Sequence, residues 1–436
     1  MPESVSPNAS PALFVGVLLT LIASYGIPPL FTSHIGTATI GVHLLLTAWM
    51  LWFWQADRGT QGAAQVRRLL LLGVLARLVL LGVPAFTTHD VERYLWDGAV
   101  ALQGFDPYVI TPNDDVVSEL RNRFPTPEEH AAYPTLYPPL ALAIYTLCAL
   151  AGPVWGVWLW KLLITLTSIA TLFVVNAILR HRNQQRHLAL IALSPLMLLE
   201  VGIGAHVDAL SALALSSALW AYQRTRWLAV GVAIGLGACI KLLPIAALGP
   251  ILIATPLSRW PKIIIGSTGC VALIYGAALA LSMRPVGNLG VFFDKWRNGS
   301  PINALLESAL PQFEHTLLTL PAALVLGCVA LYRSRQDLHA GLLMMLATPL
   351  LLSPVVFPWY LLILLPLVAI RPSTFLIVWL TTVPLAYEVL DRFELTGEWS
   401  PANWPLVIIA LGWLIGAWVD RYSLFDGATA ASVSTR

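Results

Sequence analysis

WGVWLWKLLITLTSIATLFVVNAIL, residues 155 to 179, is the stretch of the sequence that decides the fold. It carries a single charged side chain, Lys161. A helix of about 20 apolar residues crosses the ~30 Å hydrocarbon core of a membrane, so this stretch predicts a transmembrane helix. Trp155, Trp158 and Trp160 gather at its start, as aromatic residues do at a membrane interface. Lys161, close to them, is expected to extend its ammonium group toward the lipid headgroups.

Comparable apolar runs recur from Pro11 almost to Asp420. The chain is 57% hydrophobic and only 11% charged, whereas a soluble domain carries about 25% charged residues. The sequence therefore predicts an all-α fold, a polytopic transmembrane helical bundle of about 12 to 14 membrane segments, in a single domain over residues 1–436. The expected simple spans are 11–31, 38–55, 67–86, 155–179, 188–204, 209–223, 263–282, 316–332, 340–356, 359–370, 373–390 and 404–419.

Two further segments do not fit a simple crossing. Residues 137–151 are short for a span and are expected to be a re-entrant or interfacial element on the outer side. Residues 227–257 lie between two basic connectors and must enter the membrane and return. Two half-length helices that meet near Lys241-Leu-Leu-Pro244 satisfy that constraint, because proline favours the break. A broken helix at membrane depth must face protein or a wet cavity, which predicts Lys241 in a cavity.

The distribution of charge predicts the orientation. Lys and Arg concentrate in short connectors, such as 180–187 and 224–226, and such connectors stay on the cytoplasmic side. Acidic residues cluster instead in three segments, 90–129, 294–314 and 388–398, which we expect to face outward. The first two lie in the expected first (87–136) and second (283–315) large outer loops, with interfacial helices. The net charge is only +2, and the basic residues are scattered over short loops. Both observations argue against a nucleic-acid partner.

The first outer loop contains the most informative motif, Thr88-His-Asp-Val-Glu-Arg-Tyr-Leu-Trp-Asp-Gly98, followed by Gly104-Phe-Asp-Pro-Tyr108. Asp90 and Glu92 directly follow an apolar span, where carboxylates are costly unless they are solvated or used. Most acids of such a loop are ordinary solvated side chains. Asp90 is the exception that we single out as a candidate catalytic residue, because of the resemblance that this motif carries.

The chain resembles the GT-C superfamily of membrane glycosyltransferases, and within it the bacterial polyprenyl-phosphate-mannose-dependent mannosyltransferases. The likeness starts in the first outer loop and covers most of the chain after Leu69. Five further features follow in the matching order: Leu136-Tyr-Pro-Pro139, Ser194-Pro195 with Glu200 and Gly204-Ala-His-Val-Asp208, Ile240-Lys-Leu-Leu-Pro244, Lys295-Trp-Arg-Asn298, and Phe357-Pro-Trp-Tyr-Leu361. The chain departs from the family in having Asp90-x-Glu92 where Asp-x-Asp is often seen, which leaves open which acid is the base.

The resemblance implies an inverting transferase that moves a sugar, mannose by likeness, from a polyprenyl-phosphate donor to a hydroxyl group of a glycolipid, glycan or protein. It also implies a multi-pass protein of a bacterial inner or plasma membrane, in contact with membrane lipid, whose active site faces the non-cytoplasmic side.

The chemistry of such a transfer suggests roles for the charged residues. A carboxylate suits the base that deprotonates the acceptor hydroxyl, and by resemblance this is Asp90, with Glu92 as the alternative. The departing phosphate gathers negative charge and needs cations. The candidates for binding the donor phosphate are Lys241, Arg297 and Lys295.

Several other residues are candidates for binding substrate. They are His206, Asp208, Tyr137, Asn298, Trp359 and Tyr360. Alternatives stay open for them, since Asp208 can cap a helix and Trp359 and Tyr360 can belong to an aromatic belt. Glu200 lies deeper in its span and is a candidate buried polar link.

A divalent cation, Mg²⁺ or Mn²⁺, is a further cofactor expectation, with Asp90, Glu92 and Asp208 as the available ligands. A secondary transporter or a flippase for lipid-linked sugars is the alternative function, because it would also use broken helices and intramembrane charge. An accessory subunit without chemistry is a third alternative.

Overall fold

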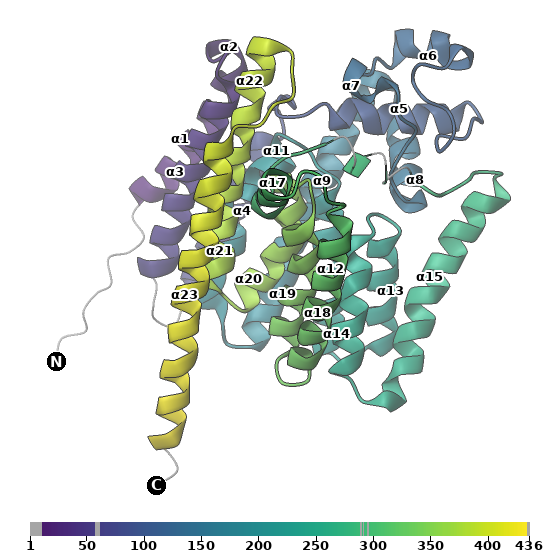
Figure 1. Ribbon diagram of the computed structural model, residues 1–436. Helices are drawn as coiled ribbons and strands as arrows, with labels where there is room; N and C mark the ends of the chain where they lie inside the picture. The colour runs from purple at the N-terminus through teal and green to yellow at the C-terminus, as the bar shows by residue number, and fades with distance from the viewer. Residues whose placement is uncertain (1–10, 57–61, 288–289, 291, 294–295, 434–436) are drawn as a thin grey trace.

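The computed structural model describes residues 11–56, 62–287, 290, 292–293 and 296–433, and within these ranges the protein is helical with one isolated β-bridge. Figure 1 shows long helices packed side by side, with the short helices α5, α6 and α7 gathered at one end, which we call the site end. In the described part of the chain, six helices are long and apolar enough to cross a membrane. The prediction of an all-α polytopic membrane bundle is confirmed.

The first half of the bundle contains both long and short helices. They are α1 (Pro11–Ala23), α2 (Ile27–Leu30), α3 (Ile35–Ala56), α4 (Ala63–Leu80), α5 (Asp90–Leu102), α6 (Ser118–Arg123), α7 (Glu128–Ala131), α8 (Pro139–Ala149), α9 (Gly152–His181), α10 (Ala189–Ala192), α11 (Pro195–Gly202), α12 (Asp208–Gln223) and α13 (Trp227–Ala238).

The second half continues the bundle, with 3₁₀ turns η4 (Leu243–Ala247), η6 (Pro358–Leu364) and η7 (Val383–Tyr387) between helices. Its helices are α14 (Leu248–Ile253), α15 (Trp260–Ala280), α17 (Pro301–Ala309), α18 (Thr316–Ser334), α19 (Leu338–Leu352), α20 (Leu365–Ile370), α21 (Thr374–Thr382), α22 (Glu388–Thr396) and α23 (Asn403–Val433).

Several expected spans are built from short pieces rather than one helix. The segment 188–204 consists of α10 and α11, and 359–370 consists of η6 and α20. Proline explains both breaks, because its ring removes a backbone donor and clashes with the preceding turn. The break in 227–257 is also present, since α13 ends at Ala238 and η4 begins at Leu243. The segment 137–151 forms the short helix α8, which packs on α5 and α9 near the site end.

A buried arginine repairs the break between α10 and α11. Pro195 has no N–H to donate to the carbonyl of Ile191, four residues earlier in the chain. Arg77 of α4 supplies the missing donors, giving hydrogen bonds to the carbonyls of Ile191 (3.0 Å) and Ala192 (2.9 Å) and to Ser168 Oγ (2.7 Å). The break is therefore held by α4 and α9 together, which fixes where α11 starts.

A buried lysine holds the other end of α11. Lys161 of α9 is 3% exposed, and its ammonium group donates to the carbonyls of Gly202 and Val83. The expectation that Lys161 extends toward lipid headgroups is wrong. The carbonyl of Val83, in the segment after α4, and that of Gly202, the last residue of α11, give the ammonium group better partners inside the protein.

We expect Arg77→Leu to destabilise the protein strongly, because two backbone carbonyls inside an apolar bundle lose their donors. Each buried polar group without a partner costs about 1–3 kcal/mol. The purified variant in detergent should unfold at a clearly lower temperature than the wild type. Arg68→Leu is the control, since Arg68 is exposed on the same helix. Equal melting temperatures of the two variants would contradict this account of the break.

Candidate active site

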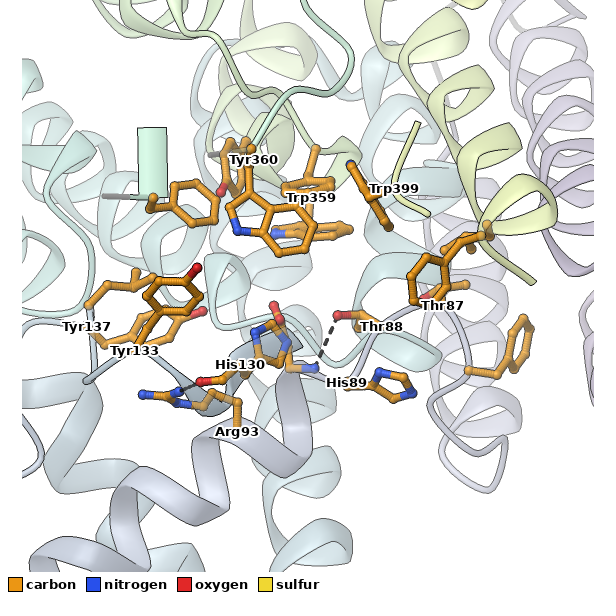
Figure 2. A pocket seen from close by; sticks show the side chains of 18 of the residues that line it. Thr87, Thr88, His89, Arg93, His130, Tyr133, Tyr137, Trp359, Tyr360 and Trp399 are labelled. Atoms are coloured by element: carbon orange, nitrogen blue, oxygen red, sulfur yellow. Dashed lines mark hydrogen bonds between the residues drawn. The ribbon is translucent and has the colours of Figure 1, made fainter. Parts of the chain in front are cut away.

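A cavity of ≈ 300 Å³ lies at the site end, beside the N-terminus of α5. Its walls come from segments far apart in the sequence, on both sides of the bundle. The lining residues are drawn from 86–93, 130–137, Lys241, 292–296, 357–360 and 390–399. Aromatic rings dominate one part of the wall, and Figure 2 shows Trp359, Tyr360 and Trp399 there, opposite His130, His89 and Arg93.

Asp90 is the first residue of α5 and lines this cavity. Its Oδ2 accepts a hydrogen bond from the Tyr94 hydroxyl (3.0 Å) and lies 3.3 Å from His206 Nδ1. Burial raises the pKa of Asp90, but the contacts with His206 and Tyr94 outweigh burial and lower that pKa to about 2. The first turn of a helix also favours a negative charge. Asp90 is therefore ionised at neutral pH.

Glu92 does not belong to the lining of the cavity. Two residues along a helix differ in direction by roughly 200°, so Asp90 and Glu92 point to different sides of α5. Of the two acids that the sequence singles out, only Asp90 reaches the space where a substrate could bind.

His206 lies in the turn between α11 and α12, at 0% exposure. Its ring stacks on Trp359, with ring centroids 3.8 Å apart and planes inclined by 11°. The turn is tight: Ala205 has φ = 50°, and its carbonyl accepts a hydrogen bond from Trp160 (2.8 Å). Burial lowers the pKa of His206, but Asp90 and Glu200 outweigh burial and raise that pKa above its ordinary value.

Lys241, at the break after α13, lines the cavity and pairs with Asp208, the first residue of α12 (Nζ to Oδ1, 2.5 Å). The ammonium group also lies 4.1 Å from the centre of the Tyr360 ring. This places a cation in the same cavity as the Asp90 carboxylate.

The other predicted site residues divide into two groups. Tyr137, Trp359 and Tyr360 line the cavity. Arg297 does not line it, because its guanidinium pairs with Glu307 of α17. Asn298 is also outside the lining: it is buried and forms the parallel β-bridge with Val355. Lys295 lies outside the described residues.

Some residues around the site were not identified from the sequence. His43 of α3 and Tyr387 of η7 both contact Glu200, at 3.4 Å and 2.6 Å. An ionisable residue inside an apolar span, as His43 is, was a usable signal. Tyr387 gave none. The aromatic part of the wall also includes Trp296 and Trp399, whose ring centroids are 5.1 Å apart.

A scan against protein-family models matches residues 6–256 to the alpha-(1->6)-mannopyranosyltransferase N-terminal domain. That range covers more than half of the chain and contains Asp90, His206 and Lys241. The chain belongs to the alpha-(1->6)-mannopyranosyltransferase family. No curated protein matches it.

Membership of the mannopyranosyltransferase family makes the protein a glycosyltransferase, in agreement with the resemblance seen in the sequence. It favours the enzyme over a transporter or an accessory subunit. The cavity of this mannosyltransferase also takes residues from beyond the matched range, such as Trp359 and Trp399.

A ligand set for a divalent cation is not assembled in the described part of this mannosyltransferase. Nowhere among those residues do three His, Cys, Asp or Glu side chains gather as a metal site requires. Of the three acids that the sequence offered, Glu92 is outside the cavity lining and Asp208 is held by Lys241. We therefore assign no metal ligands.

The position of His206 in the mannosyltransferase site can be tested through Gly204. A Cβ at this position would lie 2.3 Å from His206 Nε2. The imidazole is fixed by Trp359 and cannot give way without leaving Asp90, so Gly204→Ala should reduce sugar transfer by about 10²-fold. Gly269→Ala is the control, since nothing lies within 4 Å of a Cβ there. Transfer by the Gly204 variant at the control rate would contradict this geometry.

Proposed function

We propose that the protein transfers mannose from a polyprenyl-phosphate donor to an acceptor hydroxyl group on the non-cytoplasmic side of the membrane. The observation that carries this proposal is the presence of an ionised carboxylate, Asp90, and a cation, Lys241, in one cavity of a mannosyltransferase. A base and a phosphate-binding cation are the two groups that transfer from a sugar phosphate requires.

In the proposed reaction, the acceptor hydroxyl loses its proton to Asp90 as its oxygen attacks the anomeric carbon of the donor. The new carbon–oxygen bond forms on the face opposite the phosphate. The bond between that carbon and the phosphate oxygen breaks, and its electron pair leaves with the phosphate. The anomeric configuration is therefore inverted. The phosphate leaves as an anion, so no general acid is needed.

Lys241 is the cation that we assign to the departing phosphate. Its partner Asp208 and the ring of Tyr360 hold the ammonium group at the cavity wall. The phosphate would take over the contact from Asp208. Arg297 and Lys295 stay candidates for an accessory role, and the pairing of Arg297 with Glu307 makes Lys241 the stronger choice.

The orientation is supported by where the basic connectors lie. Asp208 at the start of α12 belongs to the site, so Arg224 at the end of α12 lies toward the opposite end of the bundle. In the same way η6 starts at the cavity wall, and Arg371, at the end of α20, lies away from it and pairs with Asp337 (2.7 Å). Basic connectors stay on the cytoplasmic side, which supports the proposal that the cavity opens on the other side.

The aromatic part of the wall suits a mannosyl lipid. Sugar rings present an apolar face of C–H groups that stacks on aromatic side chains. Tyr360 is the candidate that we assign to this contact, because the ring of Trp359 already stacks on His206 and Phe357. Tyr137 and Asn298 stay candidates for binding substrate, the latter from outside the lining.

Asp90→Asn should abolish most transfer, because a positioned general base contributes about 10²- to 10⁴-fold. Purified protein in detergent is incubated with radiolabelled polyprenyl-phosphate mannose and lipid acceptors, with and without a chelator. Glu92→Gln should lose much less transfer activity, because Glu92 lies outside the cavity lining. Product formation by the Asp90 variant at the wild-type rate would overturn the assignment of the base, and the chelator arm reports on a divalent cation.

Lys241→Gln should raise KM for the donor by about 10- to 100-fold, since a hydrogen bond to a charged group is worth ~1.5–3 kcal/mol. Arg297→Gln should raise KM for the donor less, because the Arg297 side chain is already paired with Glu307. Donor saturation curves for the two variants measure this. A larger effect at Arg297 would move the phosphate site away from Lys241.

A further inference from the structure

A buried row of ionisable side chains leads from the cavity into the bundle. It starts at Asp90, continues through His206 and Glu200, and ends at His43. The distances between the interacting atoms are 3.3 Å from Asp90 to His206 Nδ1, 3.4 Å from His206 Nε2 to Glu200, and 3.4 Å from Glu200 to His43 Nε2. Tyr387 adds a hydrogen bond to Glu200 Oε2 (2.6 Å).

Glu200 is in an environment that makes a carboxyl group costly. It is 1% exposed on α11, where every residue of the helix is buried and the other seven are apolar or glycine. A carboxylate in such a place is destabilising unless it is paired and hydrogen-bonded, and ionisable residues inside membrane bundles usually serve function. Packing alone does not explain why a carboxyl group is buried at the position of Glu200.

The contacts of Glu200 converge on His206. The Glu200 carbonyl accepts the backbone N–H of His206 (3.0 Å), and the Glu200 carboxylate faces His206 Nε2. One residue thus holds both the backbone and the ring of His206. Tyr387 donates to the Glu200 carboxylate, which favours its ionised form and fixes its direction.

The stereochemistry of imidazole limits what His206 can do between two carboxylates. A neutral imidazole has one N–H and one acceptor nitrogen. Glu200 favours the N–H at Nε2, whereas the ionised carboxylate of Asp90 favours an N–H at Nδ1. If the N–H is at Nε2, Nδ1 has a lone pair that can accept the proton once Asp90 has become a neutral carboxylic acid. With Glu200 absent, nothing would hold this tautomer.

Building on the proposed function, we propose that Glu200 is a positioning residue that holds the Nε2–H tautomer of His206, so that Nδ1 can take the proton that Asp90 removes from the acceptor. The acceptor O–H bond breaks, the proton passes to Asp90 and then to His206 Nδ1, and Asp90 is again an ionised carboxylate. The imidazolium that forms lies between Asp90 and Glu200 and returns its proton to water through the cavity.

The charged and titratable groups around His206 come from several elements. Asp90 of α5 and Glu200 of α11 face the ring, with Tyr94 behind the first and His43 and Tyr387 behind the second. The Asp208–Lys241 pair lies beside the turn. Among these, only the two carboxylates contact the ring nitrogens.

Glu200→Gln tests the proposal because it keeps the shape and removes the negative charge. We expect kcat to fall by about 10²-fold or more, with the donor KM unchanged. The variant should also lower the pKa of His206, since the imidazolium loses a charge partner. Neutral His206 would then persist to lower pH, and the acid limb of the pH profile should move down by about one unit or more. Glu119→Gln, on the exposed face of α6, is the control.

A role in packing alone would reduce folded protein without moving the acid limb. Wild-type kcat in Glu200→Gln, or a reduced kcat with an unmoved acid limb, overturns the proposal. Failure of the proposed function looks different, because then the wild type itself forms no product from polyprenyl-phosphate mannose.

If the Glu200 variant does not yield folded protein, Tyr387→Phe decides. It leaves the carboxylate in place but removes the hydroxyl that aligns it. A reduced kcat with unchanged donor KM supports the proposal, and a wild-type kcat overturns it.

Discussion

The structure depends on one constraint: backbone carbonyls that are freed where helices break inside an apolar bundle must find donors. Arg77 and Lys161, both buried, satisfy those at the two ends of α11. Trp160 does the same for Ala205 in the turn that follows. Because these three donors hold α11 and its turn, His206 is placed with little freedom against the cavity.

The same constraint explains why charged groups gather at one end of a protein with so few charges. A broken helix brings Lys241 to the cavity, and the start of another places Asp208 against Lys241. Asp90 begins α5 at the same place. Helix ends and breaks expose polar backbone that stabilises such side chains, whereas continuous apolar helices do not. The position of the site thus follows from the places where the helices are interrupted.

The sequence predicted the parts that depend on local signals. The proline near Lys241 predicted that this residue lies at a helix break facing a cavity, and the acidic motif after an apolar span predicted Asp90 as a site residue. Prediction from the sequence failed where contacts join distant segments. The pairing of Arg297 with Glu307 of α17 could not be seen before the loop was folded. Lys161 was predicted at the membrane interface because nothing in its own helix indicates the open carbonyls of Val83, which follows α4, and of Gly202 in α11. Tyr387 lies 187 residues after Glu200 in the sequence, so only the fold reveals their contact.

The central claim is that one cavity holds the donor phosphate at Lys241 and the attacking hydroxyl at Asp90. A structure of the protein with a non-transferable phosphonate analogue of polyprenyl-phosphate mannose tests it most directly. We predict a phosphonate oxygen ~3 Å from Lys241 Nζ, with the Asp208 contact released and the anomeric carbon open toward Asp90. A phosphonate bound away from Lys241, or a sugar turned so that Asp90 cannot reach an attacking hydroxyl, would contradict the account.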